Sequence, residues 1–276
     1  MSRQLPRFAL RLLLMTGAGA RLWTSRSYLR QVQYRTEANL AARQSIYAYQ
    51  HPPIDLPAAV LDLAALRRTE TVADIGCGNG AYLAELARRQ HAGPVLGIDL
   101  STGMLAAARR RAPAAALVAG DASALPVRDH AASLTLAAHM LYHVPDPRAA
   151  IRELRRITRP AGQVLVVLNG HNHLRELRDL VTSLQIVSHE GPLGDQLRLD
   201  DGQELLASEF TSVIRHDFTS ELRIPGPAPI EYYIRSMISS PDRHDPAVRA
   251  VTVASYFPAS GGPFRICAST GCLVCS

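Results

Sequence analysis

The sequence contains no lysine, so all thirty of its basic residues are arginines. A chain without lysine cannot hold the Tyr-x-x-x-Lys dyad of nicotinamide-dependent oxidoreductases. Long apolar runs are also missing. Arg11 divides the apolar stretch near the N-terminus, and the remaining run, residues 12–15, is shorter than the roughly 7–15 residues of a signal-peptide core. It is also too short to span a bilayer. The sequence therefore predicts a cytoplasmic protein without a membrane span.

Cysteine is scarce, and its distribution excludes a disulfide framework. Three of the four cysteines, Cys267, Cys272 and Cys275, lie in the last ten residues, and Cys77 is far from them. A zinc site needs four ligands, so Cys272-x-x-Cys275 alone is a weak metal signal. We interpret these residues as small apolar side chains of a final strand. The sequence predicts no metal site, and a reducing compartment fits this cysteine usage.

The positive charge is concentrated in the first 43 residues. Eight arginines there oppose one acid, Glu37, which gives +7, so a total of +6 leaves about −1 for the rest of the chain. A nearly neutral body lacks the broad basic face that binding to a phosphate backbone requires. We therefore expect no nucleic-acid partner, and we expect a monomer or homodimer.

The N-terminal third divides into an arm and a leader. Residues 1–30 form a basic arm, and Met15-Thr16-Gly17 is a plausible alternative start, so we expect residues 1–14 to be dispensable. Residues 31–70 are predicted to form a helical leader or lid, interrupted at Pro52-Pro53. Residues 71–170 are expected to form a ligand-binding core, and residues 171–276 to complete the core and add a substrate cap.

From residue 71 on, short β-rich runs alternate with amphipathic helical stretches, which is typical of a parallel sheet covered by helices on both faces. The predicted helices are residues 81–90, 103–112 and 147–158. Beyond His173 we expect a helix over 174–187, a polar loop, a strand near 211–218, a helix near 230–237 and a final strand from Phe264. The five predicted strands of the core are TVADI (71–75), PVLGID (94–99), AALVA (115–119), ASLTLAAH (132–139) and QVLVVL (163–168).

A glycine-rich turn follows the first predicted strand, and an acid ends the second. The turn Asp74-Ile75-Gly76-Cys77-Gly78-Asn79-Gly80 permits close approach of the backbone to a ligand beside unpaired amides at a helix N-terminus. Asp99 lies at the carboxyl edge of the sheet, where a carboxylate can accept hydrogen bonds from ribose hydroxyls. Alternatively, Asp99 or Ser101 begins the next helix as its N-cap, and both roles can coexist. These features alone also fit a dinucleotide site.

With these residues the sequence resembles class I S-adenosylmethionine-dependent methyltransferases, in particular the small-molecule group that includes the ubiquinone and menaquinone biosynthesis enzymes. The resemblance covers residues 71–169 well. It implies an α/β, Rossmann-like three-layer sandwich with a mostly parallel seven-stranded sheet, its last strand antiparallel. A helical leader and a cap insertion are expected in addition. The motifs, in order, are VADIGCGNG (72–80), VLGIDLSTGML (95–105), AGDASALPV (119–127), LAAHMLYHVPDP (136–147) and LRRITRPAGQVLVV (154–167).

The resemblance implies a role for each matching residue. Gly76, Cys77 and Gly78 would pass beneath the methionine part of the donor, with Asp74 at its amino group. Asp99 would take the ribose hydroxyls. The remaining cofactor-binding residues are Leu100 and Met104 along the adenine slot, Asp121 at the adenine amine, Ala122 at a ring nitrogen, and the backbone of Ala138 and His139 at the methionine end. Two positions depart from the family pattern, Ala161 for a glycine and Ala138 for a polar residue.

Methyl transfer needs mainly positioning, and a general base helps only where the acceptor must lose a proton. Four histidines follow the fourth and fifth strands: His139, His143, His171 and His173. We favour His139 and His173 as bases, and expect His143 to pack or hydrogen-bond locally and His171 to be exposed. A metal site made from all four has little support.

The acceptor is predicted to be a small molecule. The sequence has no (Asp/Asn)-Pro-Pro-Tyr segment and no Pro-Cys nucleophile, so DNA is an unlikely substrate. We predict methylation at O, N or C of a metabolite. The alternatives are an NAD(P)-dependent oxidoreductase and a non-catalytic S-adenosylmethionine-binding protein. The acceptor pocket is expected between residues 34–53 and 169–240, with Tyr47, Tyr49, Tyr142, Tyr232 and Tyr233 as candidate lining residues.

Overall fold

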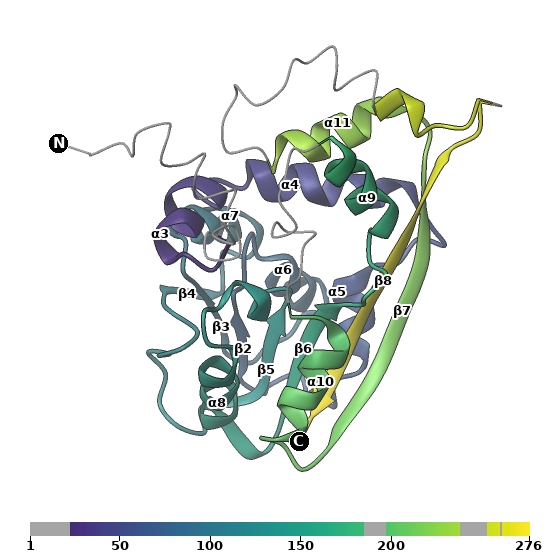
Figure 1. The fold of residues 1–276 in the computed structure, drawn as a ribbon. Helices are drawn as coiled ribbons and strands as arrows, with labels where there is room; N and C mark the ends of the chain where they lie inside the picture. Colours follow the sequence, from purple (N-terminus) through teal and green to yellow (C-terminus); the bar gives the residue numbers. More distant parts are fainter. Residues whose placement is uncertain (1–22, 185–196, 238–252, 260) are drawn as a thin grey trace.

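The computed structural model describes residues 23–184, 197–237, 253–259 and 261–276 (Figure 1). Residues 1–22, with the alternative start at Met15, lie outside this part of the chain. So do residues 185–187 at the end of one predicted helix and residues 238–240 at the end of the predicted cap.

A single mixed sheet runs through the described residues, in the order β1-β7-β8-β6-β5-β2-β3-β4. The five strands β4, β3, β2, β5 and β6 are parallel to one another, and β8 is antiparallel to both β6 and β7. The α/β architecture and the antiparallel last strand are therefore as predicted. The strands are β1 (Gln50–His51), β2 (Val72–Ile75), β3 (Val95–Asp99), β4 (Ala116–Ala119), β5 (Ala132–Ala138), β6 (Thr158–Asn169), β7 (Val213–Ile224) and β8 (Phe264–Cys275).

The sheet has eight strands where seven were predicted, because the leader contributes an edge strand. Gln50 pairs with Leu222 and His51 with Glu221 in the antiparallel β1–β7 ladder. Two residues are too few to produce a periodic pattern, so β1 could not be predicted from the sequence. The strand joins the leader to the end of the sheet where the cap also lies.

The helices at the core turns begin where the sequence predicts. Ser101 caps α7 and Asp146 caps α8, each accepting a hydrogen bond from a backbone amide of the first helical turn. The core helices are α6 (Ala81–Arg88), α7 (Thr102–Arg111), η3 (Leu141–His143) and α8 (Pro147–Ile157). The others are α3 (Arg26–Tyr28), η1 (Leu29–Gln33), α4 (Ala38–Gln44), η2 (Ser45–Tyr49), α5 (Leu56–Asp62), α9 (Arg175–Ser183), α10 (Leu199–Ala207) and α11 (Pro227–Arg235).

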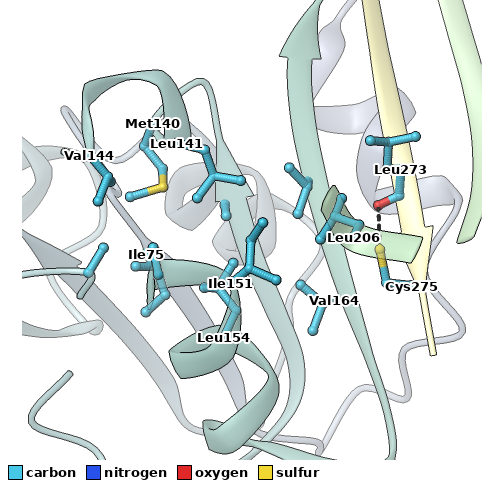
Figure 2. Close-up of a cluster of buried hydrophobic side chains, with 14 of the residues drawn as sticks. Ile75, Met140, Leu141, Val144, Ile151, Leu154, Val164, Leu206, Leu273 and Cys275 are labelled. Carbon is cyan, nitrogen blue, oxygen red and sulfur yellow. Dashed lines mark hydrogen bonds between the residues drawn. The ribbon is translucent and has the colours of Figure 1, made fainter. Parts of the chain in front are cut away.

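Helix α10 occupies a region that was predicted to be a polar loop. Leu199 and Leu206 are fully buried, and Gly202 lies so close to Leu168 of β6 that a Cβ would approach within 2.2 Å. Two aspartates and a glycine follow Leu199 in α10, so its sequence is typical of a polar loop rather than of a helix with a buried face. Figure 2 shows Leu206 beside Val164 in the same core as Ile151 and Leu154 of α8.

The terminal cysteines lie on opposite faces of β8. Cys272 packs into the core cluster that contains Val72 and Leu165, whereas Cys275 packs with Val164 and Leu273. Both thiols are buried and free. Cys272 and Cys275 therefore serve as apolar core residues, and burial raises the pKa of each to about 12.

Helices α4, α9 and α11 gather at one end of the sheet, beyond the carboxyl ends of the parallel strands (Figure 1). Their buried side chains form a separate core with Ile46 of η2 and the upper parts of β7 and β8, including Leu177, Ile230 and Ile266. None of the described helices is long and apolar enough to cross a membrane.

Candidate active site

A cavity of about 530 Å³ opens at this end of the sheet. All ten residues predicted to bind the cofactor line it, and so do His139 and His173. We call the part lined by these cofactor motifs the donor lobe, defined by Asp74, Gly76, Cys77, Gly78, Asp99, Leu100, Met104, Asp121, Ala122 and Ala138. The acceptor lobe is the part lined by side chains of the leader, the C-terminal part of the chain and the segment after β5, defined by Tyr34, Arg43, Tyr47, Tyr142, His173, Phe218 and Tyr233.

The glycine turn of the donor lobe depends on left-handed backbone. Gly76 and Gly78 have φ values of +69° and +53°. A Cβ on Gly76 would lie 2.6 Å from Cβ of Met140, which leaves no room for a side chain, whereas a Cβ on Gly78 would meet only Leu40, at 3.7 Å. The turn therefore presents bare backbone to the cavity.

Asp99 holds this turn in place while facing the cavity. Its Oδ2 accepts from the Gly78 amide at 2.8 Å, and its Oδ1 accepts from the Ser101 amide at 2.8 Å. Ser101, and not Asp99, supplies the N-cap of α7, since Ser101 Oγ accepts from the Met104 amide. Each carboxylate oxygen of Asp99 retains a second lone pair for a ligand.

Asp74 is a buried carboxylate without a partner. Its side chain lies at the end of β2, is 1% exposed, and its Oδ2 has no hydrogen-bond donor among the described residues. Burial, together with the negative charge of Asp99, raises the pKa of Asp74 to about 7. An ammonium group would satisfy this carboxylate, which is what the predicted donor carries at its methionine end.

Asp121 is already engaged by the leader. Arg26 of α3 forms an ion pair with Oδ2 of Asp121, and the Ser123 amide donates to Oδ1 at 2.8 Å. The donor lobe thus collects three carboxylates, those of Asp74, Asp99 and Asp121. S-adenosylmethionine carries one net positive charge, so both the charge and the open backbone of this lobe fit that donor.

Two of the four candidate histidines have both ring nitrogens engaged. His143 Nδ1 lies 3.2 Å from the Trp23 carbonyl and must donate to it, so its Nε2 accepts from the Tyr34 hydroxyl at 2.9 Å. His173 Nδ1 accepts from the Ser269 amide at 3.2 Å, so its Nε2 donates to Tyr47 Oη at 3.0 Å. Burial lowers the pKa of His143 to about 4 and that of His173 to about 3.

His139 differs from them, because its ring has no hydrogen-bond partner within the described part of the chain. It directly follows β5, with a left-handed φ of +55° and its amide donating to the Val167 carbonyl at 2.9 Å. A non-glycine residue in this conformation stores strain that is often tied to function. Burial lowers the pKa of His139 to about 4. His171, by contrast, is exposed.

The aromatic predictions are met in part. Tyr47, Tyr142 and Tyr233 line the cavity, whereas Tyr232 is half exposed and Tyr49 packs against the cap core. Sequence reasoning missed Tyr34, Arg43 and Phe218 as lining residues. The two departures from the motif pattern are accommodated: Ala161 lies within β6, and Ala138 contributes backbone at the cavity wall.

The chain matches known methyltransferases in sequence and fold. The family model described as a methyltransferase domain matches residues 73–166. A demethylmenaquinone methyltransferase of Beutenbergia cavernae is 38% identical over 39% of this chain and 44% of its own length. A 23S rRNA (guanine(748)-N(1))-methyltransferase of Streptomyces fradiae is 35% identical over 58% of this chain and 55% of its own. The chain thus spans about half the length of these curated relatives.

The fold comparison covers more of the chain. A putative methyltransferase from Bacillus halodurans aligns with 79% of this chain and 96% of its own, with a TM-score of 0.59 at 17% identity. At that identity the likeness concerns the fold, and the motifs carry the family assignment. Residues 73–166 therefore match a methyltransferase domain, and they contain the motifs by which the sequence resembles class I S-adenosylmethionine-dependent enzymes.

Proposed function

We propose that the protein transfers a methyl group from S-adenosylmethionine to an O, N or C atom of a small metabolite. The observation that carries this proposal is the single cavity, in which the motif residues of the donor lobe adjoin an aromatic acceptor lobe. His139 directly follows β5 and lines the same cavity as His143 and His173.

The donor lobe supplies binding and orientation. Gly76 and Gly78 expose backbone, Asp74 offers an unpaired carboxylate to an ammonium group, and Asp99 offers lone pairs to ribose hydroxyls. The bound donor brings a methyl group activated by a positively charged sulfur. The protein therefore has to align the acceptor atom with that methyl group and exclude water.

His139 is the residue we assign as general base. Its ring has no hydrogen-bond partner among the described residues, and its lowered pKa, about 4, leaves the imidazole neutral, so that one ring nitrogen has a lone pair for the proton of the acceptor. His173 uses Nδ1 for the Ser269 amide, so the role we propose for it is to orient the Tyr47 hydroxyl toward the acceptor lobe.

A small-molecule acceptor agrees with the charge distribution better than RNA does. Outside residues 1–43 the chain carries about −1, and most of the side chains that define the acceptor lobe are tyrosines and a phenylalanine. In the division that we propose, residues 31–70 supply Tyr34 and Tyr47, the core 71–170 supplies the donor lobe, and residues 171–276 supply His173 and Tyr233.

Calorimetry tests the donor assignment. S-adenosylhomocysteine should bind with low-micromolar affinity and NAD should not bind, whereas the reverse result would overturn the proposal in favour of an oxidoreductase. Radiolabelled methyl transfer to a fractionated small-molecule extract should exceed transfer to purified ribosomal RNA. Absence of turnover with every fraction would instead favour a non-catalytic binding protein.

His139→Gln tests the base with any acceptor found in this way. We expect kcat to fall by about a hundredfold or more while S-adenosylhomocysteine affinity stays unchanged, because a general base acts only in the transition state. His171→Gln is the matched control, since His171 is exposed. Full activity of His139→Gln would remove His139 from the mechanism.

A further inference from the structure

Arg43 carries a buried positive charge that no carboxylate of the described residues neutralises. The side chain is 9% exposed, lies near the end of α4 and lines the cavity. No Asp or Glu of the described residues forms an ion pair with it, whereas the buried Glu85 and the half-buried Glu153 are each paired with an arginine. A buried guanidinium without a counter-ion is costly unless a ligand supplies one.

The protein contacts of Arg43 are all neutral. Its Nη1 donates to the Ser236 carbonyl at 3.4 Å, and its guanidinium carbon lies 5.4 Å from the centre of the Tyr34 ring. The Gln33 side-chain oxygen, in the amide orientation that satisfies both groups, accepts from Nη2 at 3.2 Å. The Gln33 oxygen also accepts from Nη1, so these contacts hold the guanidinium in position at the cavity wall through neutral groups.

The surroundings of Arg43 belong to the acceptor lobe. Its charge acts on Tyr34, Tyr142 and Tyr233, lowering pKa values that burial raises. Tyr233 comes from α11 of the cap, and Tyr142 follows β5. The donor lobe has its own neutral amide pair beside the glycine turn, where Asn79 Nδ2 donates to Gln44 Oε1 at 3.2 Å.

We infer that Arg43 anchors a carboxylate of the methyl acceptor, so that the substrate class is a flat, apolar organic acid. The inference rests on the proposed methyl transfer. Tyrosine and phenylalanine walls bind the apolar body of such a molecule, and the planar guanidinium matches a carboxylate through two parallel hydrogen bonds. The carboxylate of the substrate would supply the negative charge that Arg43 lacks among the described residues.

The test uses the full-length protein saturated with S-adenosylhomocysteine and two matched sets of probes. The acids are benzoate, 4-hydroxybenzoate and 2-naphthoate, and the neutral partners are the corresponding amides. Calorimetry should show that at least one acid binds at least about tenfold more tightly than its amide, the size expected for a charge-assisted pair. Arg43→Met should abolish this preference, and Arg152→Met, an exposed arginine of α8, should retain it.

Three kinds of result would overturn the inference, and a fourth would refute only the proposed methyl donor. Equal binding of acids and amides, or no binding of any acid, would show that the lobe does not select a carboxylate. An acid preference that survives in Arg43→Met would place the anion elsewhere. A loss of S-adenosylhomocysteine affinity in Arg43→Met, with acid binding retained, would assign Arg43 to the donor's own carboxylate. Failure of the wild-type protein to bind S-adenosylhomocysteine, with acid preference intact, would refute only the proposed methyl donor.

Thermal stability gives a check that needs no ligand. If Arg43 is retained for a substrate, its replacement by Met should leave the unfolding midpoint equal or higher, since an unpaired buried charge is removed. Arg43→Lys should keep part of the acid preference. A marked fall of the midpoint in both variants would show that Arg43 is a structural residue, against the inference.

Discussion

The two lobes of the cavity are built in different ways. The donor lobe comes from successive strand-to-helix turns between Asp74 and His139, and much of its surface is backbone. The acceptor lobe is made of side chains from the leader, the cap and the segment after β5, and Tyr34 and Tyr233, far apart in sequence, both line it. The donor lobe is therefore specified by local sequence, whereas the acceptor lobe depends on long-range packing.

The charges differ in the same way. The donor lobe places three carboxylates, Asp74, Asp99 and Asp121, around the space for a cationic cofactor. The acceptor lobe holds the unpaired guanidinium of Arg43 among aromatic rings. The difference in charge between the lobes would orient a cationic and an anionic ligand within one cavity. A variant in one lobe should therefore change the affinity for one ligand and leave the affinity for the other unchanged.

The largest effect is expected at Gly76. In Gly76→Ala the new methyl group meets Met140 at 2.6 Å, in a backbone with φ of +69°. Overpacking and left-handed strain together should destabilise the fold by about 3 kcal/mol, and the displaced turn should lower S-adenosylhomocysteine affinity by about a hundredfold or more, since about 1.4 kcal/mol corresponds to tenfold.

Urea unfolding and calorimetry measure the two effects. Gly226→Ala is the matched control, since Gly226 has extended backbone and no atom within 4 Å of its Cβ position. Equal stability of the two variants would show that the turn can relax around a side chain, and the donor lobe would then be less dependent on backbone than we argue.

Asp99 and Ser101 should separate ligand binding from folding within one turn. Asp99→Ala should weaken S-adenosylhomocysteine binding by about ten- to a hundredfold, because charged hydrogen bonds contribute roughly 1.5–3 kcal/mol. Ser101→Ala removes the N-cap of α7 and should cost about 1 kcal/mol of stability with little change in affinity. Calorimetry gives the S-adenosylhomocysteine affinity of each variant, and denaturation gives its free energy of unfolding. A loss of stability without a loss of affinity in Asp99→Ala would contradict the assignment of Asp99 to the ribose hydroxyls.

The donor lobe was predictable because its signals are local. Gly76, Gly78 and Asp99 occupy fixed offsets from a strand, and a strand–turn–helix unit brings them to the sheet edge whatever the rest of the chain does. The sheet core was predictable from its apolar runs, since β2 and β5 are almost wholly buried. For these strands, the run of apolar residues in the sequence is enough to predict that both faces are buried in the sheet.

The acceptor lobe was predictable only as a list of candidates. Arg43 meets Ser236 across 193 positions of sequence, and His143 meets Trp23 across 120. No local pattern encodes such pairs, so the engaged state of His143 and the unpaired state of Arg43 emerge only in three dimensions. The same holds for His173, whose role depends on an amide of β8, that of Ser269.

His173 should make acid sensitivity a property of the acceptor lobe. Burial lowers its pKa to about 3 in the folded protein, against about 6.5 in an unfolded chain. Below pH 6.5 the unfolded state binds a proton that the folded state does not, so stability falls as the pH falls. Between pH 7.5 and pH 5 this single group should remove about 2 kcal/mol.

His173→Gln isolates that contribution. Glutamine can still accept from the Ser269 amide and donate to Tyr47, but it cannot take up a proton. Relative to wild type, the variant should gain about 2 kcal/mol in unfolding free energy as the pH drops from 7.5 to 5. Opposing effects of Asp74 and Asp99, whose folded pKa values are raised, cancel in this difference. A pH-independent difference would show that His173 is protonated in the folded state.

The smallest effect should come from Arg26, where the leader meets the donor lobe. The side chains of the Arg26–Asp121 ion pair are 56% and 27% exposed, so Arg26→Ala should change stability by less than about 1 kcal/mol.

The effect of Arg26→Ala on affinity is more informative, because Asp121 is the residue we expect at the adenine amine. Arg26 occupies Oδ2 and the Ser123 amide occupies Oδ1, so removing Arg26 frees acceptor capacity. We expect S-adenosylhomocysteine to bind up to about threefold more tightly to Arg26→Ala, a gain well below one full hydrogen bond. Asp121→Ala should weaken binding, and combined with Arg26→Ala it should cancel the gain. Weaker binding to Arg26→Ala alone would mean that the leader arginine orients Asp121 and belongs to the donor lobe itself.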